Sequence, residues 1–328
     1  MLNFRNLLLF IVLSFLAACS QANQAVVQGS DSYTTVQTPE LNTLVLAETP
    51  VVSKHPVASN ETPIDISPTW TGQPTIHPTL VRDAWKYLPV VPDVSVNARE
   101  IYQRGVELGN DPHRFSKVGD CQNVSSYFMG IFENPDEYQL GPDYAYLQET
   151  IDYYQGSFSR TSYSVKGGYN VAAILTPLRA DQKVCGNKQS PLECELNDWR
   201  PSIAIVSLEE WWADRPVDDY SAYLDKAIQI MIDKGTLPIM ATRAGNTVHV
   251  YALNDAIARV AHKHDVPLWN FWSAIQPLPN RGLTEDGFHL TFARNIFSDP
   301  LRMKAAWPWR NLTALQVLHT VRLAVETH

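Results

Sequence analysis

The second half of the chain alternates continuous apolar runs with amphipathic stretches. Apolar runs of strand length occupy residues 201–208, 236–242 and 266–272, and residues 219–234 and 250–264 between them carry apolar side chains at helical spacing. Strands that alternate with helices in this way favour crossover connections and a parallel sheet with helices on both faces. The pattern therefore predicts an α/β fold, a three-layer α/β/α sandwich with a mainly parallel central sheet.

An earlier strand is predicted to end at the turn Gly119-Asp120-Cys121. The residues after this turn follow a helical pattern, with apolar side chains at Tyr127, Phe128, Ile131 and Phe132. A strand that ends in a tight turn and opens a helix places the turn at the carboxyl edge of a sheet, where open α/β sheets bind ligands. Further helices are predicted over residues 97–108, 142–154 and 312–325.

The N-terminal segment has the pattern of an export signal. Arg5 precedes an apolar run over residues 7–18, which is too short to span a bilayer comfortably, and the run ends in Leu16-Ala17-Ala18-Cys19. This ending resembles a bacterial lipobox. The resemblance implies that residues 1–18 are a lipoprotein signal peptide, that Cys19 is acylated, and that the protein is anchored to a membrane outside the cytoplasm. The alternative is an ordinary cleaved signal with a chance cysteine.

Composition changes after the signal. Residues 19–75 are rich in Thr, Ser, Val and Pro, contain few charges and show no lasting periodicity, which predicts an extended tether. Residues 76–328 are then the folded domain. The whole chain of 328 residues is 45% hydrophobic, enough for one α/β domain with additional segments.

Charge narrows the range of partners. The formal net charge is −8, and no run of Lys and Arg occurs outside the N-terminal region, which argues against nucleic acid as a ligand. We expect a monomer that contacts the membrane through its lipid.

Near the C-terminus, Asp286 precedes His289 by three residues. A carboxylate at this spacing can hold one imidazole nitrogen and leave the other to act as a base. Such a base needs a nucleophile within hydrogen-bond reach, and the candidate is Cys121, which would complete a Cys-His-Asp triad. The alternative is an ordinary surface aspartate beside a structural histidine.

These motifs together resemble the SGNH (GDSL-type) hydrolase superfamily over residues 113–325. The turn ending in Cys121 matches its first block, Gly168 its second-block glycine, and Asp286-Gly287-Phe288-His289-Leu290 its last block. The resemblance implies an ester hydrolase with Cys121 as nucleophile, His289 as base and acid, and Asp286 orienting the histidine. It implies an oxyanion hole from the backbone N–H groups of Cys121 and Gly168, an acyl-ester substrate that could be carried on a glycan, and no metal or organic cofactor.

The chain departs from this family at two positions. Cys121 replaces the nucleophilic serine, and Glu209-Glu210-Trp211-Trp212 stands where the family has a turn with an oxyanion-binding Asn. Losing one oxyanion donor costs about 10²–10³ in rate. Asn123 and Asn246 are candidate replacement donors. A cysteine beside a histidine and a helix N-terminus can still be a good nucleophile. The departures also support an alternative, a catalytically inactive relative that binds a cell-surface glycan or protein.

The remaining cysteines and tryptophans have structural interpretations. Cys185 and Cys194 share one loop and are predicted to form a local disulfide, although either could instead pair with Cys121. A zinc site from Cys121, His289 and a carboxylate lacks a supporting ligand spacing. Trp211 and Trp212 follow a strand at the predicted active edge, where an indole can stack on a sugar, but packing is the commoner role.

Overall fold

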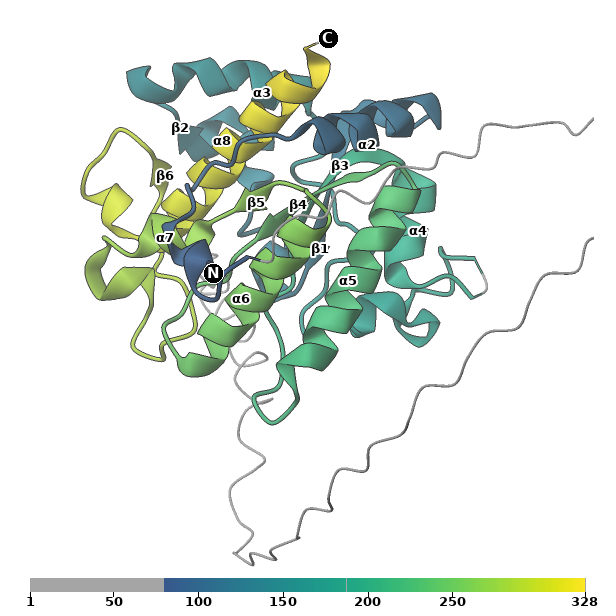
Figure 1. The fold of residues 1–328 in the computed structure, drawn as a ribbon. Coiled ribbons are helices and arrows are strands. Elements are labelled where there is room, and N and C mark those ends of the chain that lie inside the picture. Colours follow the sequence, from purple (N-terminus) through teal and green to yellow (C-terminus); the bar gives the residue numbers. More distant parts are fainter. Residues whose placement is uncertain (1–79, 187, 328) are drawn as a thin grey trace, which may run out of the picture. The chain divides into compact units, whose positions relative to one another are not determined.

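The computed structural model describes residues 80–186 and 188–327, which Figure 1 draws in colour. The predicted signal peptide, the lipidation site Cys19 and the tether up to residue 75 lie outside these residues. Within them, no helix combines the length and apolar character needed to cross a membrane.

The main sheet of the described residues has four strands in the order β1-β3-β4-β5, and each neighbouring pair is parallel. The strands are β1 (Asp111–Gly119), β3 (Pro201–Ser207), β4 (Leu237–Ala241) and β5 (Leu268–Trp269). Gly119 at the end of β1 pairs with Ser207 at the end of β3, so the two strands stop at the same edge. A short second sheet pairs β2 (Tyr138–Gln139) with β6 (Asn295–Ile296).

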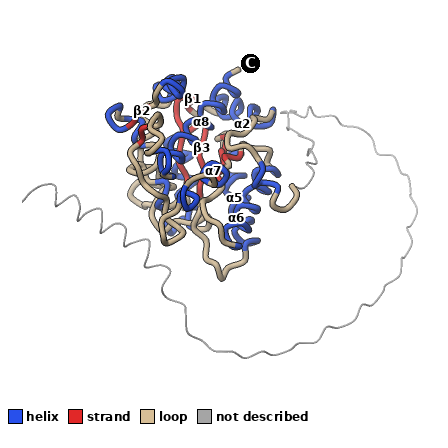
Figure 2. Tube along the Cα trace, turned by 90° about the vertical axis from the view of Figure 1, so that its left-hand side faces the viewer, coloured by secondary structure: helices blue, strands red, loops and turns tan. Residues whose placement is uncertain are grey.

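Helices cover both faces of this sheet, which confirms the predicted α/β/α architecture; Figure 2 shows the strands between them. Helices α4 (Pro191–Trp199), α5 (Val217–Asp233) and α6 (Val248–Lys263) form one layer, with α5 beside α6 (Figure 1). Helices α2 (Val96–Glu107) and α8 (Ala306–Glu326) contact each other in the opposite layer. All seven residues of β3 are buried, as a strand covered on both faces requires.

The helix predicted directly after Cys121 is not an α-helix. The structure has a short 3₁₀ turn at Cys121–Asn123, extended backbone at Val124, and a second 3₁₀ turn at Gly130–Glu133. The backbone of Met129 is left-handed, with φ of 62°, and this interrupts any regular helix. The expected support of the thiolate by an α-helix N-terminus is therefore absent.

Other differences from the predicted elements are local. Residues 142–154 form a 3₁₀ segment, Pro142–Leu147, that leads into α3 (Gln148–Tyr153). The predicted strand at 266–272 ends early, because the Asn270 side chain accepts from the Ser273 N–H and starts α7 (Phe271–Ile275). Helix α4 was not predicted.

Candidate active site

The turn that carries Cys121 is joined to the neighbouring strand through Asp120. Its Oδ1 accepts from the Gln122 N–H at 2.9 Å, and its Oδ2 accepts from the Glu209 N–H at 2.9 Å. Asp120 is only 1% exposed, and burial followed by the charges of Glu209 and Glu210 raises its pKa to about 7. Half-buried Cys121 follows Asp120 directly, so the hydrogen bonds of Asp120 to its own turn and to the loop after β3 position the backbone of Cys121.

Asn123 helps to close this turn. Its side-chain amide donates to the Ser207 carbonyl at 2.8 Å, and the residue is fully buried. A Cβ at Gly119 would overlap both the Asn123 amide and the Ser207 carbonyl, so only glycine fits there. Asn123 therefore braces the turn, and its role as an oxyanion donor stays a prediction. The other candidate, Asn246, is half-buried and accepts from the Tyr251 hydroxyl at 3.3 Å; its role stays a prediction.

A buried ion pair lies behind the turn. Glu209 Oε1 accepts from the Ser207 hydroxyl at 2.7 Å and from the Arg310 guanidinium at 2.8 Å. Arg310 also donates to the Ser207 hydroxyl at 2.8 Å and is fully buried. Its guanidinium lies 4.9–5.8 Å from the centroids of four aromatic rings, those of Phe128, Trp269, Phe271 and Trp307. Glu209, the second residue after β3, is thus part of the core, which the sequence did not indicate.

The Asp286 and His289 pair forms as predicted by their spacing. His289 Nδ1 lies 2.5 Å from Asp286 Oδ2, and Asp286 Oδ1 accepts from the Thr284 hydroxyl at 2.6 Å and the His289 N–H at 3.0 Å. Burial alone raises the pKa of Asp286, but the hydrogen bonds from His289 and Thr284 outweigh it and hold the pKa below its ordinary value. An ionised carboxylate that accepts from Nδ1 leaves the lone pair of Nε2 available as a base.

Two interactions connect the histidine turn to the loops that follow β3 and β4. Glu210 interacts electrostatically with Arg243 and His289, while burial raises its pKa. The Arg243 guanidinium lies 5.7 Å from the Phe288 ring centroid. Arg243 follows β4 (Leu237–Ala241), and Glu209, after β3, is bonded to Asp120, so the turns that carry His289 and Cys121 both lie toward the carboxyl edge of the sheet.

Gly168 belongs to a segment that runs along the cysteine turn. The Gly119 carbonyl accepts from the Lys166 N–H at 3.4 Å, and Gly119 forms a parallel bridge with Val165. A Cβ built at Gly167 would lie 3.8 Å from the Cβ of Cys121. Gly168 itself is exposed and has φ of 79°, a conformation that favours glycine. The predicted second-block glycine therefore lies near the candidate nucleophile.

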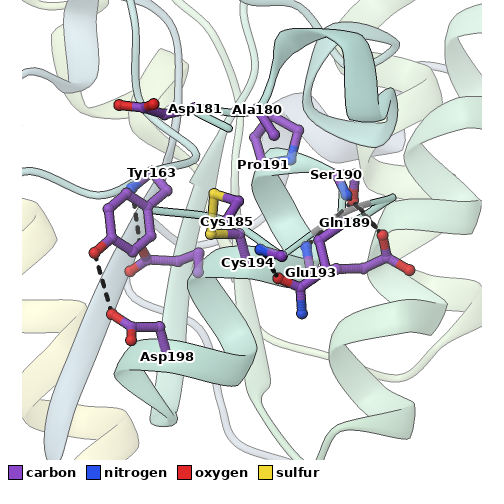
Figure 3. The surroundings of a disulfide bond; sticks show 12 residues. Tyr163, Ala180, Asp181, Cys185, Gln189, Ser190, Pro191, Glu193, Cys194 and Asp198 are labelled. Carbon is purple, nitrogen blue, oxygen red and sulfur yellow. Dashed lines mark hydrogen bonds between the residues drawn. A yellow bond between two sulfur atoms is a disulfide. The ribbon is translucent and has the colours of Figure 1, made fainter. Parts of the chain in front are cut away.

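The disulfide joins Cys185 to Cys194, with a sulfur–sulfur distance of 2.05 Å (Figure 3). This pairing excludes the alternative in which either of them bonds to Cys121. Cys194 lies in α4, which starts with a capping box in which Ser190 and Glu193 bond reciprocally. Ser190 followed three residues later by Glu193, with proline at the first helical position, is a sequence signal that could have predicted this helix.

No group of three or more His, Cys, Asp or Glu side chains that could hold a metal ion occurs in the part of the chain that the structure describes. No protein-family model matches the chain, and a search of curated proteins also finds no match.

Proposed function

We propose that this protein is an SGNH-like ester hydrolase of the cell envelope, anchored through lipid on Cys19 and acting through Cys121, His289 and Asp286. The observation that carries the proposal is the Asp286–His289 hydrogen bond, in a turn that lies beside Arg243 past the carboxyl end of β4, the sheet edge at which β1 also ends. Ligands of open α/β sheets bind at this edge. The orientation of the imidazole by a carboxylate is the arrangement that a base needs beside a nucleophile.

The chemistry would proceed in two stages. His289 Nε2 takes the proton from the Cys121 thiol, and the thiolate attacks the ester carbonyl. Backbone N–H groups of Cys121 and Gly168 donate to the oxyanion. As the intermediate collapses, the C–O bond breaks, the alcohol leaves with the proton from His289, and a thioester remains on Cys121. Water, deprotonated by His289, then attacks the thioester and releases the carboxylic acid and the thiol.

Hydrolysis of an aryl acetate by the purified full-length protein in detergent tests the proposal. Replacing the nucleophile by Cys121→Ala or the base by His289→Ala should reduce kcat/KM by at least about 10³-fold. Iodoacetamide labelling, located by peptide mapping, should modify Cys121 in the wild type and more slowly in His289→Ala. A wild type that is no more active than both variants would refute the enzyme hypothesis.

The second candidate is an inactive relative that binds a glycan or partner without hydrolysing it. The specific observation in its favour is the burial of Glu209 against Arg310, because the family has an oxyanion-binding Asn in this turn. A Cys121→Ser variant separates the candidates. Activity in this variant shows that the rest of the site supports hydrolysis with either nucleophile. Inactivity of both the wild type and Cys121→Ser favours binding.

A further inference from the structure

A cavity of about 430 Å³ opens next to Gly168. Its walls come from the segment that follows Gly168, the loop after β3 and helix α5. Two aromatic side chains on these walls are unusually accessible: Trp212 is 51% exposed and Tyr223 is 43% exposed. Large aromatic rings are normally buried, so exposed rings that line a cavity offer apolar faces to a ligand.

The charge of this cavity is entirely positive. Lys226 and Arg179 line it, and no Asp or Glu does. Within residues 80–186 and 188–327, neither cation forms a salt bridge. A third cation, Arg215, lies 5.5 Å from the centroid of the Trp212 ring. In a chain with net charge −8, this local excess of positive charge favours an anionic ligand.

A second cavity, of about 310 Å³ between α5 and α6, provides a contrast. It also contains two cations, but Lys263 is 2.7 Å from Asp225, and Arg259 is paired with Asp255. Asp218 and Asp225 line this second cavity as well. Its charges are therefore neutralised within the protein, whereas those of the cavity beside Gly168 have no carboxylate among the lining residues.

We infer that the cavity beside Gly168 binds an anionic sugar residue of the glycan that carries the ester. The rings of Trp212 and Tyr223 would contact the sugar faces, and Lys226 and Arg179 would pair with its carboxylate. This inference rests on the proposed function for its link to the ester. That link is spatial: Gly168 lines the cavity, and a Cβ at the preceding Gly167 would lie 3.8 Å from the Cβ of Cys121.

Binding is tested with trigalacturonate and, as a neutral control of the same ring type, its methyl ester. Titrations use full-length Cys121→Ala protein in detergent, so that no turnover disturbs them, with calorimetry as the readout. We expect trigalacturonate to bind at least about tenfold more tightly than its methyl ester. Its affinity should fall as the salt concentration is raised from about 0.05 to about 0.5 M, because salt screens exposed charges. Equal binding of both ligands, or binding of neither, would overturn the inference.

Three variants locate the site. Lys226→Gln should weaken trigalacturonate binding about three- to fivefold, as expected for a partly exposed ion pair. Trp212→Ala should weaken it about tenfold through loss of the ring contact. Lys234→Gln changes the residue that follows α5, outside both cavities, and should leave the affinity unchanged. An equal loss in Lys226→Gln and Lys234→Gln would refute the assigned site.

The same proteins distinguish a failure of this inference from a failure of the proposed function. Aryl acetate is neutral and small, so its hydrolysis by wild type does not depend on the cavity. Hydrolysis without trigalacturonate binding would overturn the anionic subsite and leave the esterase proposal intact. Trigalacturonate binding without hydrolysis of any ester would support the subsite and refute the esterase.

Discussion

The turns that carry Cys121 and His289 are built in opposite ways. Around Cys121, Asp120 and Asn123 are buried and bond to the end of β3 and the loop that follows it. Around His289, the side chains of Asp286 and His289 are 48% and 31% exposed, and the hydrogen bonds of Asp286 come from residues 284–289. One half of the candidate site is therefore part of the core, whereas the other is a self-contained surface turn.

Because of this difference, substitutions in the two turns should affect different properties, the stability of the domain in one case and catalysis in the other. Changes behind the Cys121 turn remove partners from groups that water cannot reach, so they should destabilise the whole domain. Changes in the His289 turn leave groups that water can solvate, so they should alter catalysis with little effect on folding. The two kinds of change can be measured independently.

The largest expected effect comes from Arg310→Met. This substitution leaves Glu209 buried without its positive partner, which costs about 3–5 kcal/mol of unfolding free energy. The matched control is Arg302→Met, because Arg302 pairs with Asp299 at 3.7 Å with a side chain 47% exposed, and such pairs contribute at most about 1 kcal/mol. Urea unfolding followed by tryptophan fluorescence measures both. Similar losses in the two variants would contradict the contrast between buried and exposed pairs.

The next effect is catalytic. In Asp286→Asn, the amide can donate to His289 Nδ1, which places the imidazole proton on Nε2 and removes the base. We expect kcat/KM for an aryl acetate to fall by about 10³-fold, with the unfolding free energy changed by less than about 1 kcal/mol. Glu285→Gln, on the exposed neighbouring residue, serves as control and should retain activity. A destabilised Asp286→Asn protein would show that this turn is not self-contained.

The same contrast explains which features could be predicted from the sequence. The Asp286–His289 contact is local, so three-residue spacing was sufficient to predict it. The strands and helices α5 and α6 follow from period and length, because their burial patterns are regular. The backbone after Cys121 could not be predicted, since it depends on Asp120, Asn123 and their partners near β3, which are more than 80 residues away in the chain. Apolar spacing alone misleadingly indicated a helix there.

The buried position of Arg310 could not be predicted from the sequence either. It lies in α8, where a charged residue ordinarily indicates a solvent-facing position. Only the fold brings Glu209 and four aromatic rings around it. The cavity beside Gly168 has the same origin, because its lining comes from three separate segments of the chain.

The smallest expected effect is a pH dependence of stability that arises from the buried half of the site. The pKa of Asp120 is raised to about 7 by burial and by Glu209 and Glu210, so the folded state binds this proton more tightly than the unfolded state. Its contribution to stability is complete below about pH 4 and is lost as the pH rises to about 7. Asp286 has the opposite shift, so its contribution is lost only in more acidic solution, below about pH 4.

Unfolding free energies at pH 5 and pH 7 test this sign. From pH 5 to pH 7, Asp120 should account for a loss of about 1–2 kcal/mol in the wild type, and the loss should shrink by that amount in Asp120→Asn. Asp286→Asn should keep the wild-type difference, because its window lies outside this range. Burial lowers the pKa of Lys117 to about 7, so this lysine adds stability mainly above pH 7, and the upper limit of pH 7 keeps its contribution small. An unchanged pH difference in Asp120→Asn would show that another group holds the proton.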